Sequence, residues 1–120
     1  IEMKSIVLTK NIADRVMVLI NSSLADILIM NLLTNAIRHN IHHGTIHISL
    51  DPRYLIIKNM GRTPTLPMEQ VFERFRRTSD DSDSVGLGLS IVKQICDVSG
   101  LTIQYTFEED QHIVKVTIPS

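Results

Sequence analysis

The chain has 120 residues, of which 43% are hydrophobic and 21% are charged, and its formal net charge is −1 at pH 7. These values are typical of one globular domain that is large enough to bury a core without disulfides. The near-neutral charge excludes a generally basic surface, so we expect no nucleic acid partner. The single cysteine, Cys96, lies among apolar helical residues, which favours a core thiol in a reducing compartment. No apolar run is long enough to cross a bilayer and no signal-peptide pattern opens the chain, so we expect no direct membrane contact by this segment.

The N-terminal third predicts two strands followed by one long helix. Glu2–Leu8 and Arg15–Ile20 are rich in Val, Ile, Leu and Met, and we expect them to pair as strands. The stretch Leu24–Asn40, LADILIMNLLTNAIRHN, predicts a very apolar helix that begins with a capping box formed by Ser23 and Asp26. Because the chain goes almost straight into strand-like sequence, we expect it to be a piece of a longer protein.

The predicted helix carries a polar stripe. Asn31 and Asn35 are four residues apart, and either Arg38 or His39 continues the same stripe. Asn is a poor residue for a helix interior because its amide competes for backbone hydrogen bonds. The stripe indicates either a bound polar ligand or two buried amides that neighbouring strands satisfy, and taken alone it does not decide between them.

The middle of the chain predicts a hairpin that brings a third asparagine inward. Thr45–Leu50 alternates between apolar and polar residues, and Tyr54–Asn59 is expected to pair with it. Asn59 has the same parity as Leu55 and Ile57, so it should point to the same face as two core residues.

The next segment predicts a short helix, a loop and a second long helix. Met68–Phe75 is expected to be helical, with Val71, Phe72 and Phe75 inward, and Arg77–Val85 to be a polar, acid-rich loop. Gly86-Leu87-Gly88 then leads into a helix that runs to about Ser99. Its expected buried side comprises Leu89, Ile91, Val92, Ile95 and Cys96.

The two long helices are expected to end at Gly44 and Gly100. The chain then closes with the clearest strand pattern, in which Leu101–Phe107 and Val114–Ile118 alternate as an antiparallel hairpin with one wet face. The predicted fold class is therefore α/β, of the α+β kind. Its architecture is a two-layer sandwich of a mixed, mainly antiparallel sheet with helices on one face.

The glycine-rich sequence SVGLGLSIVK allows two interpretations. Backbone amides at a helix N-terminus, freed of side chains by Gly86 and Gly88, form an anion site suited to phosphate. Glycine also simply begins helices, and taken alone that interpretation is the more common one. The sequence lacks the Gly-Lys-Ser/Thr ending of a Walker loop, and no strand runs directly into it as a dinucleotide fingerprint requires.

Four motifs in a fixed order are more specific than any one of them: NLLTNAIRHN, an inward polar residue before Gly61, FERFRR, and GLGLSIVKQICDVSG. Together they resemble the ATP-binding catalytic domain of bacterial two-component sensor histidine kinases. These kinases share a superfamily with DNA gyrase, heat-shock chaperones and mismatch-repair ATPases. The resemblance covers residues 1–120 as a single domain and implies a Bergerat-type ATP-binding fold. It also implies a fragment of a kinase that is anchored in the inner membrane, with this domain in the cytoplasm.

The resemblance implies a role for individual residues. Asn35 corresponds to the family's magnesium ligand, and Asn31 lines the same wall one turn earlier. Asn59 stands at the position of the adenine-binding Asp, and Arg38 and Arg77 correspond to basic residues that position the phosphates. The implied nucleotide contacts are Asn31, Asn35, Arg38, His39, Asn59, Gly61, Thr63, Phe72, Phe75, Arg77, Ser84, Gly86, Leu87, Gly88 and Leu89, with ATP and Mg²⁺ as the cofactors.

Three residues depart from the family's pattern. Asn59 replaces an Asp, so its carbonyl can still accept from the adenine amino group but the charge is lost. Thr63 and Ser84 stand where the two glycine boxes usually have a glycine, and the loop corresponding to the ATP lid is short. These departures leave open an alternative, a degenerate nucleotide-binding or protein-interaction module without kinase activity.

Position 31 bears on the reaction. Hydrolysing members of the superfamily carry a Glu there to activate water, and Asn31 cannot act as a general base. The resemblance therefore implies transfer of the γ-phosphate to a histidine on a separate helical dimerisation domain, for relay to a response regulator. Catalysis would consist of positioning and charge neutralisation, with no nucleophile in this domain. A gyrase-type ATPase is the interpretation that Asn31 disfavours.

Other reactive residues have simpler explanations. His39, His42, His43 and His47 lie close together in sequence, but no Cys or carboxylate accompanies them, so a zinc site is the minor alternative. Cys96 is expected to be a core residue. The arginines at 74, 76 and 77 form either a solvated helix face or an anion contact, and Arg77 is the preferred contact.

Overall fold

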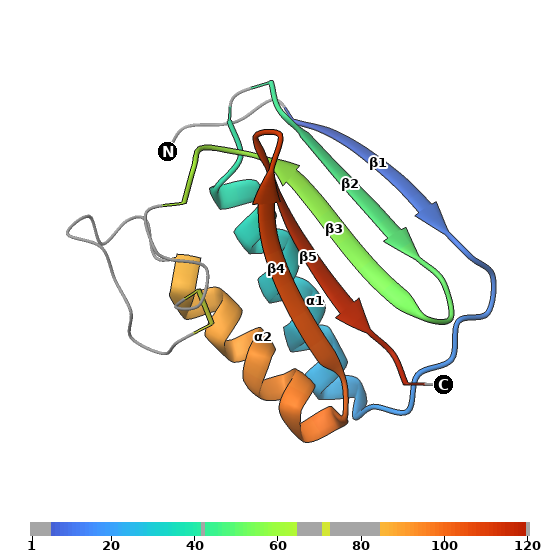
Figure 1. Ribbon diagram of the computed structural model, residues 1–120. Helices are drawn as coiled ribbons and strands as arrows, with labels where there is room; N and C mark the ends of the chain where they lie inside the picture. Colours follow the sequence, from blue (N-terminus) through green and yellow to red (C-terminus); the bar gives the residue numbers. More distant parts are fainter. Residues whose placement is uncertain (1–5, 42, 65–70, 73–84, 120) are drawn as a thin grey trace.

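The computed structural model describes residues 6–41, 43–64, 71–72 and 85–119. One five-stranded sheet forms one layer, and two helices form the other (Figure 1). The elements in chain order are β1 (Val7–Ile12), α1 (Ser22–Arg38), β2 (Thr45–Leu50), β3 (Tyr54–Met60), α2 (Val85–Ser99), β4 (Thr102–Glu108) and β5 (Gln111–Thr117).

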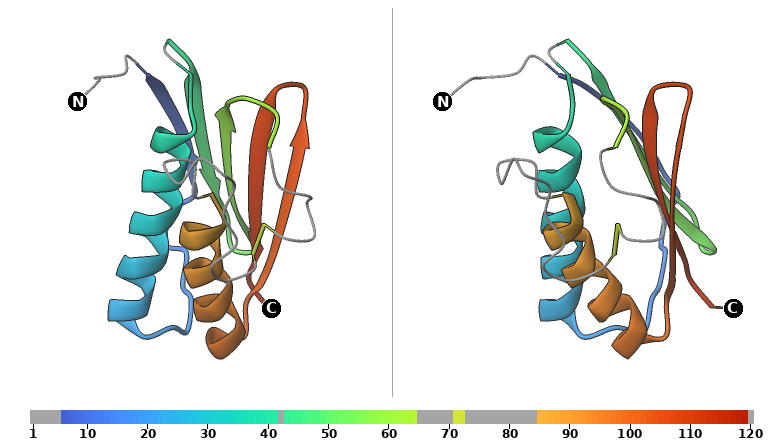
Figure 2. Two further views of the ribbon diagram at one scale, coloured as in Figure 1. Left: turned by 90° about the vertical axis from the view of Figure 1, so that its left-hand side faces the viewer. Right: turned by 60° about the vertical axis from the view of Figure 1, so that its left-hand side comes forward.

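The sheet has the strand order β1-β2-β3-β5-β4. In the described part of the chain, β1 and β2 pair in parallel, with α1 as the crossover, and the other three pairings are antiparallel. Both helices lie on the same face of the sheet (Figure 2). The predicted two-layer α+β architecture with a mixed, mainly antiparallel sheet is therefore confirmed.

The prediction for the N-terminus was wrong in two respects. The first described strand runs to Ile12 instead of ending at Leu8, and Arg15–Ile20 forms no strand, so β1 pairs with β2 instead of with that segment. Residues 2–5 of the predicted strand lie outside the described residues. In that second segment Val16 and Val18 are half-buried whereas Leu19 is exposed, so burial does alternate along it. Within the described ranges, however, no strand of the sheet pairs with this segment. The bounds of the first strand were predicted wrongly because β1 is an exposed edge strand. Backbone hydrogen bonds hold such a strand, and they form equally well with polar and apolar side chains.

The start of α1 also differs from the prediction. The helix begins at Ser22, and Asn21 is its N-cap residue, with Oδ1 accepting hydrogen bonds from the backbone amides of Ser23 (2.9 Å) and Leu24 (3.2 Å). Asn caps helices as well as Ser does, so the residue two positions earlier takes the role expected of Ser23. Asp26 consequently lies beyond the first turn and completes no capping box.

The end of α1 is built by a buried asparagine rather than by a glycine in a left-handed conformation. The helix ends at Arg38 with His39 as its C-cap residue, and the positive φ of the turn belongs to His43. Asn40 is buried, donates from Nδ2 to the carbonyl of Thr45 (2.9 Å) and accepts at Oδ1 from the amide of Ile41 (2.8 Å). A Cβ on Gly44 would collide with this same Oδ1. Gly44 is therefore required by close packing against Asn40.

The core lies between the helices and the sheet, as the alternating pattern predicts. From α2, the predicted side chains of Leu89, Val92, Ile95 and Cys96 are buried, and Ile91 is half-buried. The α1 contribution is Leu28, Leu32 and Ala36. The sheet contributes Ile46, Leu55, Ile57, Ile103, Tyr105, Val114 and Val116, and Val71 is also fully buried.

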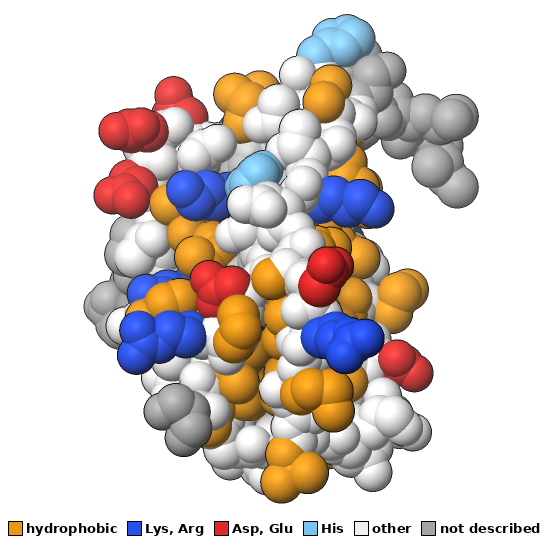
Figure 3. All heavy atoms as spheres, turned by 90° about the vertical axis from the view of Figure 1, so that its right-hand side faces the viewer, with side chains coloured by type: hydrophobic (Ala, Val, Ile, Leu, Met, Phe, Trp, Pro, Cys, Tyr) orange, Lys and Arg blue, Asp and Glu red, His pale blue; other side chains and the backbone are white. Residues whose placement is uncertain are grey.

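The opposite face of the sheet is open and mixed in character. Figure 3 shows hydrophobic side chains interspersed with Lys, Arg, Asp and Glu on this side of the molecule. Lys115 Nζ lies 4.1 Å from the centroid of the Tyr54 ring, and Thr9 Oγ1 contacts His47 Nδ1 at 2.5 Å across β1 and β2. In the described part of the chain, no helix is long and apolar enough to cross a membrane.

Burial of Cys96 predicts a pH-dependent stability. Desolvation raises the pKa of the thiol from 9.0 to about 11. Because the unfolded chain then ionises at lower pH than the folded chain, the thiol leaves the free energy of unfolding unchanged below about pH 9 and lowers it progressively between about pH 9 and 11. In urea unfolding from about pH 8 to pH 10.5, we expect Cys96→Ala to lose less stability than the wild type over the same interval. Equal losses of stability in the two proteins would show that ionisation of the Cys96 thiol does not destabilise the fold at high pH.

Candidate functional site

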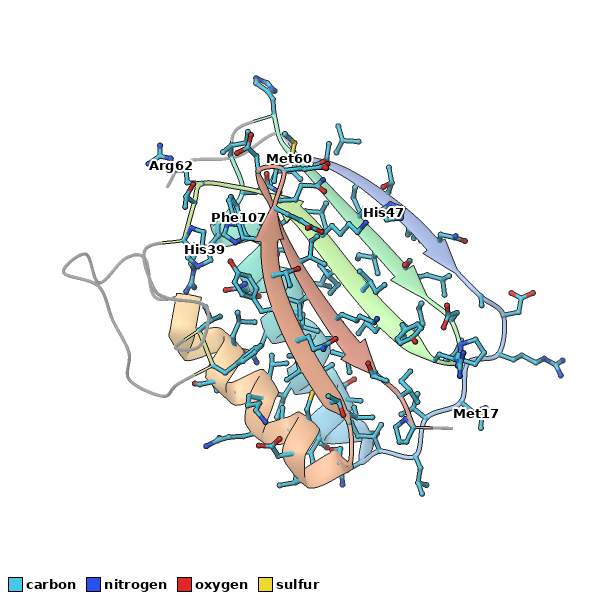
Figure 4. The ribbon with its side chains drawn as sticks, in the orientation of Figure 1. Met17, His39, His47, Met60, Arg62 and Phe107 are labelled. Atoms are coloured by element: carbon cyan, nitrogen blue, oxygen red, sulfur yellow. The ribbon has the colours of Figure 1, made fainter. Side chains whose placement is uncertain are left out.

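Several predicted site residues meet at one end of the two layers. The C-terminal end of α1, the N-terminal end of α2 and the C-terminal end of β3 all lie at this end (Figures 1 and 2). Figure 4 shows His39, Met60, Arg62 and Phe107 here, whereas Met17 lies at the opposite end. The fold thus brings together segments that are far apart in the sequence.

The polar stripe of α1 follows the i, i+4 row that ends in His39. Asn31, Asn35 and His39 are half-buried, whereas Arg38 is exposed. This row adjoins the buried row of Leu28, Leu32 and Ala36, so it borders the interior without being enclosed by it. The Asn31 amide donates from Nδ2 to the carbonyl of Ile27 (2.8 Å), which satisfies part of its polarity within the helix itself.

Asn59 lies near the end of β3 and faces the helical layer, as its parity predicts. It is only 3% exposed and sits between Ile46 of β2 and His112 of β5 in the ladder. Its Nδ2 donates to the carbonyl of Met60 at 3.1 Å. A buried amide oxygen is thereby placed at the strand end, where it can accept a hydrogen bond from a ligand.

Gly61 marks the point where the end of α1 meets the end of β3. A Cβ at this position would lie 2.5 Å from the carbonyl oxygen of His39 and 2.6 Å and 2.7 Å from Cδ2 and Nε2 of His112. The Gly61 amide also donates to the carbonyl of Asp110 (3.1 Å) in the turn between β4 and β5. This residue is glycine because backbone and ring approach it from two sides.

His112, which was not among the predicted site residues, is a buried ionisable side chain directly opposite Asn59 in the ladder. It is 5% exposed, and its Nδ1 lies 2.5 Å from the hydroxyl of Tyr105. Its ring stacks on Tyr105 at a centroid distance of 5.8 Å and packs obliquely against Phe107 at 4.8 Å. Burial raises the pKa of Tyr105 to about 12. The signal was available, because His112 has the same parity on its strand as Val114 and Val116.

The remaining predicted contacts are less closely grouped. Thr63 is exposed and Phe72 is half-buried against the core. Leu89 is completely buried, so its side chain belongs to the core and only its backbone can approach a ligand. Gly86, Leu87 and Gly88 lie within the first turn of α2, which begins at Val85, rather than before it. The other predicted contacts, Phe75, Arg77 and Ser84, lie outside the described residues, as do the arginines at 74 and 76, most of the predicted short helix and all but the last residue of the predicted loop.

The described histidines lie apart from one another. His39 borders the helical layer, His47 contacts Thr9 on the other face of the sheet, and His43 is exposed in a turn. Among the described residues, no group of three His, Cys, Asp or Glu side chains is arranged to hold a metal ion. His42 lies outside the described residues.

The chain is similar in sequence to one protein family and to several known proteins. Residues 21–120 match the family model described as histidine kinase-, DNA gyrase B- and HSP90-like ATPase. The chain is 33% identical over 99 residues to the sensor histidine kinase HprS of Escherichia coli and 36% identical over 94 residues to the heme sensor protein HssS of Staphylococcus aureus. These matches cover 77% and 73% of this chain but only 22% and 20% of the relatives, so the chain spans about a fifth of their length.

Solved structures show the same fold. A mycobacterial sensor histidine kinase, MprB, superposes with a TM-score of 0.79 at 24% identity, covering 95% of this chain and 83% of the other. The catalytic domain of the histidine kinase ThkA in a nucleotide-free form gives a TM-score of 0.78 at 23% identity, covering 95% of this chain and 78% of the other.

Proposed function

Because the chain belongs to the family of histidine kinase-, DNA gyrase B- and HSP90-like ATPases, we propose that it binds Mg-ATP and acts as the catalytic domain of a sensor histidine kinase. The observation that carries this proposal is the position of Asn59, whose buried amide lies at the end of β3 where α1 ends and α2 begins. The family match and the sensor-kinase relatives support the proposal.

The proposed purine end of the site is formed by Asn59. Its side-chain oxygen would accept a hydrogen bond from the 6-amino group of adenine. A neutral amide gives a weaker hydrogen bond than a carboxylate would, so we expect modest affinity. Half-buried Phe72 provides apolar surface near the core.

The proposed phosphate end of the site combines α1 and α2. The N-terminal turn of α2, with glycines at 86 and 88, provides free backbone amides and the positive end of the helix dipole. Exposed Arg38, one turn beyond Asn35 on α1, provides a positive charge. Arg77 is proposed for the same role from the sequence resemblance alone.

Magnesium fits the donors that are present. Asn35 is half-buried on the stripe that borders the site and offers an amide oxygen, a hard donor. Mg²⁺ commonly takes one or two protein oxygens and completes its octahedron with water and phosphate, so a single amide ligand is sufficient. When bound, the ion would neutralise charge on the phosphates.

The reaction proposed is phosphoryl transfer rather than hydrolysis. Asn31 has no basic group, and its amide is engaged with the carbonyl of Ile27, so it cannot activate water. The domain would hold ATP in line for a histidine on a separate helical dimerisation domain of the same kinase, which then passes the phosphate to a response regulator. We also propose that this region is cytoplasmic and that the parent kinase is anchored in the inner membrane.

A nucleotide titration tests this function. We expect the chain to bind ATP and a non-hydrolysable ATP analogue at up to millimolar concentration, to bind both more tightly with Mg²⁺, and to release no phosphate steadily. The absence of binding would instead favour the second candidate, a degenerate interaction module. The neutral Asn59 and the exposed Thr63 are the residues that support this alternative. Steady phosphate release would indicate a hydrolase. Isothermal titration calorimetry and a phosphate-release assay distinguish the three outcomes.

A further inference from the structure

The peptide group between Met60 and Gly61 is held from three sides. Its N–H donates to the carbonyl of Asp110 (3.1 Å), and its carbonyl accepts from Nδ2 of Asn59 (3.1 Å). On the third side the ring of His112 fills the space next to the Gly61 Cα, so closely that a Cβ there would lie 2.6 Å from ring carbon Cδ2. The orientation of this peptide therefore depends on the ring as well as on two hydrogen bonds.

His112 is itself fixed in place. The hydroxyl of Tyr105 holds its Nδ1 at 2.5 Å, and Phe107 packs against the ring from β4. His112 and Tyr105 are both buried. A ring that is packed on its faces and hydrogen-bonded at one edge has little freedom to rotate, so it acts as a rigid support under Gly61.

The orientation of the peptide decides which end of the Asn59 amide is presented to a ligand. With Nδ2 donating to the Met60 carbonyl, the side-chain oxygen Oδ1 remains the acceptor. The flipped amide would place Oδ1 about 3.1 Å from the Met60 oxygen, where two acceptors repel. An Asp would be an acceptor in either rotamer, whereas an Asn needs this backbone partner to become one.

We propose that His112, held by Tyr105, is a positioning residue that keeps Asn59 an acceptor and thereby selects purines with a 6-amino group over those with a 6-oxo group. The inference rests on the proposed nucleotide-binding function. Removal of the ring takes away one of the three constraints on the Met60–Gly61 peptide, so the peptide can shift and Asn59 can flip and donate to a 6-oxo oxygen. The specific consequence is a change in the preference between bases, which a general loss of packing does not produce.

The test compares the magnesium complexes of ATP and ITP, whose bases differ at the 6-position, with the full 120-residue chain. We expect the ratio of their affinities to fall by about five- to ten-fold in His112→Ala, the effect of one misdirected hydrogen bond. Val116→Ala is the matched control, because it truncates a buried side chain of the same strand four residues away from His112. It should lower stability without altering the ratio. An unchanged ratio in His112→Ala, or an equal change in both variants, would overturn the proposal.

Tyr105→Phe is the gentler variant if His112→Ala fails to fold. It removes only the hydroxyl that holds Nδ1, and we expect a smaller fall in the same ratio. NMR of the nucleotide-free chain gives an independent result, since one Asn59 side-chain amide proton should be protected from exchange in the wild type and less so in Tyr105→Phe. A wild type that binds no nucleotide yet shows this protection would refute the proposed function and the base selection, but not the positioning of Asn59. Equal exchange in both proteins would refute the positioning itself.

Discussion

Replacement of Gly61 with alanine should strongly weaken nucleotide binding and destabilise the fold. The new Cβ would lie 2.5 Å from the carbonyl oxygen of His39 and 2.6 Å from the ring of His112. Neither neighbour can yield easily, because one is backbone at the end of α1 and the other is a buried, hydrogen-bonded ring. Overpacking of this kind costs about 1–3 kcal/mol of unfolding free energy. The displaced strand end carries Asn59, so we also expect the affinity for Mg-ATP to fall more than about ten-fold.

Gly100→Ala provides the matched control for this prediction. Gly100 has φ of +74°, so alanine is strained there, but a Cβ would meet nothing within 4 Å. It follows α2 at the end of the molecule away from the proposed site. We expect a loss of roughly 1 kcal/mol in stability and unchanged affinity for nucleotide. Urea unfolding and calorimetric titration measure the two quantities for both variants. Equal effects on affinity would show that Gly61 has no specific role at the site.

The sequence predicted elements well wherever one side of the chain faces the core. The alternation in β2, β3, β4 and β5 and the apolar face of α2 all reflect burial against the other layer, and the structure confirms them. The end and the pairing partner of edge strand β1 were predicted wrongly because its residues are exposed and its pairing depends on backbone hydrogen bonds, which place little demand on the side chains. Asn21 was missed as a cap for a related reason, since several short polar residues fill that role equally well.

The geometry of the candidate site could be predicted only in part from the sequence, and the part that could not be predicted concerns side-chain packing. Asn59 was found because strand parity places it inward, and the same rule applied to β5 would have found His112. Its contact with Tyr105 follows from the antiparallel register of β4 and β5, which a single sequence does not reveal. The close approach of the His39 carbonyl to Gly61 depends on how α1 crosses the sheet. Contacts of this kind are set by the assembled layers, and no local pattern encodes them.

The role of Asn35 can be separated from that of Asn31 by a pair of substitutions on the same helix stripe. Asn35→Ala removes the amide oxygen that we propose as the magnesium ligand, so affinity for ATP should no longer increase when Mg²⁺ is added. We expect the affinity for Mg-ATP to fall by about ten- to a hundred-fold, the range seen when support of a metal site is lost. Affinity measured in the presence of a chelator should change little, because the lost interaction requires the ion.

Two further variants decide whether this effect belongs to the ligand atom. Asn31→Ala alters a half-buried amide one turn earlier that already bonds to the carbonyl of Ile27, so the magnesium dependence should survive. Asn35→Asp restores an oxygen donor at the same position and should recover part of the affinity, since carboxylates also bind Mg²⁺. Titration of each protein with ATP at several magnesium concentrations gives the required comparison. If Asn35→Ala keeps both its affinity and its magnesium dependence, the ion is held elsewhere. Failure of Asn35→Asp to recover affinity would mean that Asn35 acts through the shape of the helix surface rather than as a ligand.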